Sequence, residues 1–185
     1  MQKIYSKSKI LVKTQVVAAL FAVAAAVALP QLCHMLGAAL GHGSQIGEML
    51  LPMHLPIILV GMLAGPCAGA VAGALSPIVS FMLTGMPAAT MLPIMVTELC
   101  AYGLLAGLIK DTKMPCLLKL LSVQLGGRLL RSLAVVAAVY VFNSPAVNIS
   151  VIWTSITAGV WGILLQWIII PLTIYGVNRA SKNAE

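Results

Sequence analysis

Long apolar runs, separated by short polar or glycine- and proline-containing connections, divide this chain into six segments. They cover residues 10–29, 53–65, 67–84, 90–109, 117–142 and 151–175. A helix needs about 20 predominantly apolar residues to span a bilayer, and fewer where protein surrounds it. The pattern therefore predicts an all-α integral membrane protein. We expect residues 1–185 to form one domain, a compact bundle of six transmembrane helices.

Two of these segments need an explicit interpretation. The run over 10–29 follows a basic stretch, as a signal peptide would, but it is as long as a bilayer span and further spans follow it, so we expect a retained helix. The second segment is short, and only Gly65 and Pro66 separate it from the third.

The cationic residues predict the orientation of the bundle. Apart from Arg128 and Arg131, they lie at the start of the first span or before it, in or beside the fourth connection, or after the last span: Lys3, Lys7, Lys9, Lys13, Lys110, Lys113, Lys119, Arg179 and Lys182. Because cationic connections stay on the cytoplasmic side, both termini are expected inside the cell. Connections 30–52, 85–89 and 143–150 then face outward, and the first is long enough to serve as a lid.

Composition agrees with a membrane location. Hydrophobic residues make up 61% of the 185 residues and charged residues 8%, too apolar a mixture for a water-soluble core of this size. The net charge of +7 lies where topology would place it, so anionic lipid is the expected counter-charge and no nucleic acid partner is expected. The four cysteines form no CxxC pair and are interpreted as small apolar residues.

Three ionisable side chains lie inside apolar spans. Glu98 is near the middle of the fourth span, and Arg128 and Arg131 are near the middle of the fifth, where a bare guanidinium costs at least about 2.5 kcal/mol. Gln124 shares their helix face. One interpretation is a structural Glu98–arginine pair that locks two helices. The other is that one or both arginines bind an anionic ligand group, while Glu98 orients an arginine or accepts a hydrogen bond from the ligand.

Other candidate ligand contacts lie at the expected outer boundary. His54 begins the second span, and Asn148 and Trp153 flank the start of the sixth. An amide beside an indole suits a polar ligand with a flat edge. Each also has a simpler interpretation, since a histidine or tryptophan at this depth is typical of the membrane interface. His34, His42, Glu48 and His54 show no compact metal-ligand spacing, so neither a metal nor another cofactor is expected.

Small residues repeat at helical spacing in two segments. Gly65, Gly69 and Gly73 recur every four residues, which predicts that the third segment packs closely at the centre of the bundle. A second line runs along the first segment through Ala18, Ala22 and Ala26. Ordinary packing inside the bundle is one explanation of the alanine line.

Several of these features resemble a known family. Six helices, a length near 185 residues, the alanine line and the stretch Met53–Gly61 leading into a glycine-rich helix resemble the substrate-binding S components of energy-coupling factor (ECF) transporters. The resemblance is clearest over residues 51–109, including Pro77, the Thr84-Gly85-Met86-Pro87 stretch and the segment from Glu98 to Gly103. The remainder resembles the family only in helix count and topology.

The resemblance implies a function in a prokaryotic plasma membrane. Such proteins capture a vitamin at the outer face and topple when docked on a transmembrane coupling subunit and two cytoplasmic ATPases. Ala18, Ala22 and Ala26 match the family's small-residue motif, which contacts the coupling subunit. The chain carries no GxxxxGK[ST] motif, so it is not expected to be an enzyme, and ATP hydrolysis would come from the partner subunits.

The ligand and two other function classes stay open at this point. Two arginines and one glutamate favour pantothenate, with a pyridoxine-class vitamin second and cobalamin less suited to so small a polar set. A self-sufficient secondary transporter is the main alternative, although only Glu98 offers a coupling carboxylate and no internal repeat is evident. An intramembrane hydrolase is disfavoured, because neither HExxH nor GxSxG occurs.

Overall fold

The computed structural model describes residues 12–41 and 49–183, and all regular secondary structure in these ranges is helical. The helices are α1 (Val12–Ala39), α3 (His54–Ala64), α4 (Pro66–Thr84), α5 (Leu92–Ile109), α6 (Cys116–Tyr140), α7 (Ser150–Ala158) and α8 (Val160–Asn183). Five are long and apolar enough to cross a membrane, namely α1, α4, α5, α6 and the part of α8 up to Val177. The predicted all-α class is confirmed for the described residues.

The segment predicted at 53–65 is helical, but its helix is short. Helix α3 has 11 residues, which at 1.5 Å per residue gives about 16 Å, half of the roughly 30 Å hydrocarbon core. It ends at Gly65, whose φ of 110° favours glycine, and Pro66 then occupies the first turn of α4. The described residues therefore contain five helices of spanning length rather than six.

The first and last predicted spans also differ from the observed helices. Helix α1 continues through Pro30 to Ala39, so residues 30–39 are helical and do not form a connection. Proline usually ends a helix, but Pro30 is buried and packing maintains the helix around it. The segment predicted at 151–175 is divided at Gly159 into α7 and α8. Residues 10 and 11 of the first predicted span lie outside the described residues.

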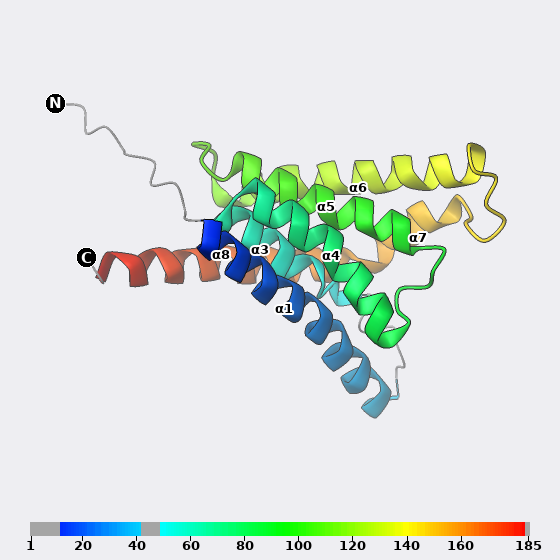
Figure 1. Cartoon of the computed structure of the whole chain (residues 1–185), viewed down its shortest axis with the longest axis horizontal. Coiled ribbons are helices and arrows are strands. Elements are labelled where there is room, and N and C mark those ends of the chain that lie inside the picture. The colour runs from blue at the N-terminus through cyan, green and yellow to red at the C-terminus, as the bar shows by residue number, and fades with distance from the viewer. Residues whose placement is uncertain (1–11, 42–48, 184–185) are drawn as a thin grey trace.

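Helices α4 and α5 form the centre of the bundle, with α1 and α6 on opposite sides of them (Figure 1). Their backbones touch at glycines: a Cβ on Gly103 would overlap with the backbone of Gly69, and one on Gly73 would overlap with the carbonyl of Leu99. Only glycine permits this approach. The central position predicted for the glycine-rich segment is thus observed.

The alanines of α1 face the same core. Ala22 and Ala26 are buried, and Ala18 is partly buried against the core cluster, where α1 packs on α3 and α4. The internal-packing explanation therefore describes their position in this structure. The exposed face of α1 carries larger residues: Val16, Val17, Leu20 and Phe21.

Several connections meet at one end of the bundle. A Cβ on Gly65 would lie 3.7 Å from Lys110 Nζ and 4.0 Å from Gln15 Nε2, so the α3–α4 junction lies beside the start of α1 and the α5–α6 turn. Lys119 Nζ also donates a hydrogen bond to the Lys110 carbonyl at 2.6 Å. Cationic side chains thus gather at this end, which we call the basic end.

The outer surface of the bundle is apolar. Phe21 is 79% exposed and Phe142 is 77% exposed, and many other leucines, valines and methionines lie on the same exterior. A water-soluble monomer rarely exposes so much contiguous apolar area. The exterior and the five long apolar helices are those of an integral membrane protein.

The glycine contact predicts a steep loss of stability on a one-carbon change. Gly103→Ala should lower the free energy of unfolding by about 1–3 kcal/mol, because the new methyl group can fit only if two backbones separate. Gly176→Ala in α8 meets no atom within 4 Å and should be neutral or slightly stabilising. Thermal unfolding in detergent measures both. Equal melting temperatures for the two variants would contradict the close contact.

Candidate functional site

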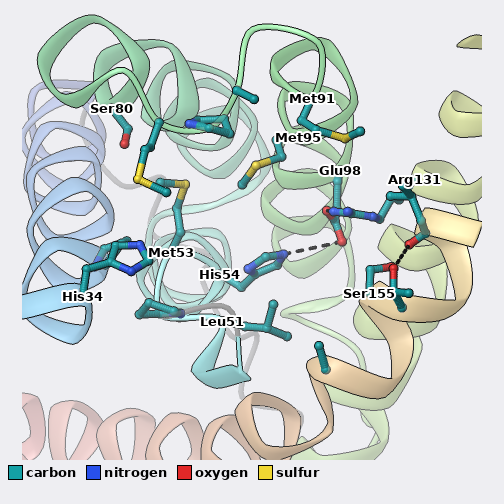
Figure 2. A pocket seen from close by; sticks show the side chains of 18 of the residues that line it. His34, Leu51, Met53, His54, Ser80, Met91, Met95, Glu98, Arg131 and Ser155 are labelled. Atoms are coloured by element: carbon teal, nitrogen blue, oxygen red, sulfur yellow. Dashed lines mark hydrogen bonds and ion pairs between the residues drawn. The ribbon is translucent and has the colours of Figure 1, made fainter. Parts of the chain in front are cut away.

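A cavity of about 500 Å³ lies among α1, α3, α4, α5, α6 and α7, away from the basic end (Figure 2). This volume is within the usual range for small-molecule sites. Its polar lining includes Gln31, His34, His54, Ser80, Glu98, Arg128, Arg131, Thr154 and Ser155, and its apolar lining includes Met53, Met86, Met91 and Met95. The charged wall formed by Glu98, Arg128 and Arg131 thus adjoins flexible thioethers, which adapt readily to a ligand's shape.

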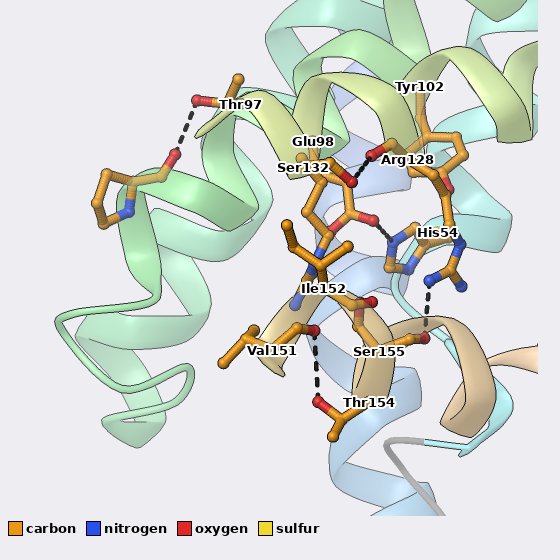
Figure 3. Close-up of polar contacts among 12 residues, drawn as sticks. His54, Thr97, Glu98, Tyr102, Arg128, Ser132, Val151, Ile152, Thr154 and Ser155 are labelled. Carbon is orange, nitrogen blue, oxygen red and sulfur yellow. Dashed lines mark hydrogen bonds and ion pairs between the residues drawn. The ribbon is translucent and has the colours of Figure 1, made fainter. Parts of the chain in front are cut away.

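Glu98 joins three helices at the charged wall. It is only 1% exposed, and its Oε2 accepts a hydrogen bond from Arg131 Nη1. Its Oε1 lies 3.5 Å from His54 Nε2 (Figure 3), at the outer limit of a hydrogen bond. The His54 ring packs edge-on against Tyr102, with 4.9 Å between ring centroids. The carboxylate thus connects α5 to α6 and α3.

Arg128 makes a different set of contacts. Its Nη1 donates to the carbonyl oxygen of Ser155 at 2.7 Å, which ties α6 to α7 (Figure 3). Its Nε and Nη2 are buried and have no hydrogen-bond partner among the described residues. Buried polar atoms are nearly always bonded, so these donors indicate a position where water or a ligand completes the site. Three further nitrogens of the lining are also buried without a hydrogen-bond partner among the described residues: Nδ1 of His34, Nδ1 of His54 and Nε of Arg131.

Gln124, a predicted site residue, lies outside the cavity lining. Its Nε2 donates to Gln166 Oε1 at 3.0 Å, and its Oε1 accepts from Trp167 Nε1 at 2.8 Å. It shares the α6 face with the arginines, but it lies one turn closer to the basic end, where it joins α6 to α8. Sequence reasoning did not identify Gln166, although a polar residue within an apolar span was the available signal.

Asn148 and Trp153 also lie apart from the cavity. Asn148 Oδ1 accepts a hydrogen bond from the Ser150 backbone N–H at 3.0 Å, and Trp153 is 70% exposed. The cavity is lined instead by Val151, Thr154, Ser155 and Ala158. These positions have the i, i+3, i+4, i+7 spacing of one helix face, and residue 153 is on another face. Treating 150–158 as a separate helix would have identified them.

The structure adds His34 to the cavity wall. The sequence placed it in a connection, but it lies in α1 one turn after Pro30, and both residues line the cavity. His42 and Glu48, considered with it as metal ligands, lie outside the described residues. In the described ranges, no three His, Cys, Asp or Glu side chains gather closely enough to hold a metal ion.

Sequence reasoning also missed the methionines of the wall. Met91, at the N-cap of α5, and Met95 and Glu98 within it recur at helical spacing, so the signal was present in the sequence. The chain was also compared with known protein families, curated proteins and solved structures, and none of them matches it. The interpretation of the cavity therefore depends on its geometry and chemistry.

The buried pair predicts non-additive effects on stability. Arg131→Ala should lower the free energy of unfolding by about 3–5 kcal/mol, because it leaves the Glu98 carboxylate buried without its main partner. The double variant Glu98→Gln, Arg131→Gln should be more stable than Arg131→Ala, since neither charge is then left alone. Thermal unfolding compares them, with exposed Arg179→Ala as the control. A double variant no more stable than Arg131→Ala would exclude this coupling.

Proposed function

We propose that this chain is the substrate-capture subunit, or S component, of an ATP-driven micronutrient importer. It binds a small water-soluble vitamin in the cavity and delivers it by toppling on a coupling module. The observation that carries the proposal is the group of buried charges, Glu98, Arg128 and Arg131, at the wall of a cavity of about 500 Å³ inside an apolar bundle. Charged residues in this setting are costly and are typically functional.

The charge balance of the cavity favours an anionic ligand. Its described lining contains two arginines and one glutamate, so with neutral histidines one positive charge is left over. Arginine suits a carboxylate because its planar group can donate to both oxygens. Pantothenate is therefore the first candidate. A pyridoxine-class vitamin is the second, because its hydroxyl groups could bond to Glu98 and His54.

The position of the cavity supports capture from outside the cell. The basic end carries the Lys110 turn and the α3–α4 junction, and the positive-inside rule assigns it to the cytoplasm. The cavity lies at the other end, which then faces outward in a prokaryotic plasma membrane. We include α3 as a sixth, short pass, because it connects the cavity end at His54 to the basic end at Gly65. Both termini are then cytoplasmic.

The energy source in this proposal is external to the chain. The sequence has no phosphate-binding GxxxxGK[ST] motif, so two cytoplasmic ATPases and a transmembrane coupling subunit supply the driving force. Helix α1 is the proposed contact with the coupling subunit. Because Ala22 and Ala26 are buried, the surface open to that partner in this arrangement is the exposed face with Val16, Val17 and Leu20.

Calorimetric titration of the detergent-purified chain tests the proposal. We expect nanomolar to low-micromolar binding of pantothenate or, failing that, of pyridoxine. The double variant Arg128→Ala, Arg131→Ala should lose binding of a carboxylate ligand, whereas Arg179→Ala should retain it, because Arg179 is exposed on α8.

Two results would count against capture for an ATP-driven module. One is a folded chain that binds no vitamin in the panel. The other is transport by the chain alone in liposomes with a proton or sodium gradient, which would establish the secondary-transporter alternative. Full pantothenate binding by the double arginine variant would exclude the carboxylate interpretation.

A further inference from the structure

The two arginines of the cavity have unequal freedom to bind a ligand. Arg131 is engaged with Glu98 through Nη1, and the two opposite charges largely cancel. Arg128 has no carboxylate partner among the described residues, and its Nη1 donates to the neutral carbonyl of Ser155. The positive charge that the cavity has in excess therefore belongs to Arg128.

From this difference we infer that Arg128 is the residue that binds the ligand's carboxylate, through its Nε and Nη2 atoms, and that the site selects a ligand with a single carboxylate. Arg131 is a positioning residue that neutralises Glu98. This inference rests on the proposed capture function and specifies its substrate class.

The guanidinium group of Arg128 has one edge that is free of hydrogen-bond partners among the described residues. With Nη1 bonded to Ser155, the two atoms left without partners are Nε and Nη2. The hydrogens of Nε and Nη2 lie along one edge of the planar group and point the same way, so they form the fork that binds both oxygens of a carboxylate. The Ser155 bond fixes the rotation of the group and so holds this fork in place.

The two donors of this fork are buried. Arg128 lines the cavity, but its Nε and Nη2 are not accessible to solvent, so a ligand reaches this edge only when the groups that cover it shift. A buried charged donor without a partner costs free energy that a bound anion would recover. If Arg128 served only to tie α7 to α6, the Nη1 bond to Ser155 would be sufficient and the Nε–Nη2 edge would have no role.

The limit to one carboxylate follows from the rest of the lining. A dianion such as a phosphate monoester would need a second free cation, but Arg131 is paired and Glu98 would repel the additional charge. The lining also carries four methionines, two of which lie beside Glu98, and they suit an apolar portion of the ligand. The expected ligand is therefore a monocarboxylate with an apolar body.

A comparison of pantothenate with its neutral alcohol, pantothenol, tests this assignment. The wild type should bind the acid about 10- to 100-fold more tightly than the alcohol, the range expected for charge-assisted hydrogen bonds. Arg128→Lys keeps the charge but lacks the fork and should lose most of this preference. Arg131→Lys can still neutralise Glu98 and should retain it, as should Arg179→Lys on the exposed part of α8. The acid-to-alcohol ratio is measured within each variant, so a change in the folded fraction does not alter it.

The outcomes separate this inference from the proposed function. Loss of the preference in Arg131→Lys but not in Arg128→Lys, or equal binding of acid and alcohol by the wild type, would overturn the assignment while vitamin capture stands. If the wild type binds neither pantothenate nor pyridoxine, the proposed capture of a vitamin is contradicted. The fork is then tested with butyrate and phosphate at matched ionic strength. Stabilisation of the wild type, but not of Arg128→Lys, by butyrate alone would support it, and no difference between the anions would overturn it.

Discussion

The burial of one carboxylate inside an apolar bundle is the constraint on which the cavity depends. Glu98 is almost fully enclosed, so it needs a cationic or hydrogen-bonding partner, which Arg131 of α6 supplies, while His54 of α3 lies 3.5 Å from its other oxygen. Removing a charge from water costs several kcal/mol, which makes a buried pair a weak source of stability but a strict requirement on geometry. Three helices must meet at this point, and the space beside them becomes the cavity.

The helices pack differently at the two ends of the bundle. Toward the basic end, Gly69 and Gly103 bring α4 and α5 into backbone contact, and the α6–α8 amide pair of Gln124 and Gln166 closes the interior. Toward the other end, α7 has no buried residue and is joined to α6 through Arg128. A closely packed half thus supports a half with fewer buried contacts, where local opening costs least.

Sequence patterns predicted depth along the membrane better than they predicted direction around each helix. The spans at 67–84, 90–109 and 117–142 end within two residues of α4, α5 and α6, because uninterrupted apolar runs set their lengths. Glu98, Arg128 and Arg131 were identified because charge is rare at such depth. By contrast, Gln124 points to α8 and Trp153 points away from the cavity, which depends on packing that no single segment encodes. Two boundaries were predicted wrongly: α1 continues through the buried Pro30, and the last segment is divided at Gly159.

The most direct test is to identify the small molecule that stays bound to the chain during purification. Native mass spectrometry of the protein purified from membranes in mild detergent, followed by release and identification of bound small molecules, requires no assumption about the vitamin. The account predicts one small monocarboxylic acid released from the wild type and from Arg179→Ala, and absent from Arg128→Ala. The same molecule recovered equally from folded Arg128→Ala, or a bound ligand without a carboxylate, would contradict the central claim that a carboxylate completes this buried cluster.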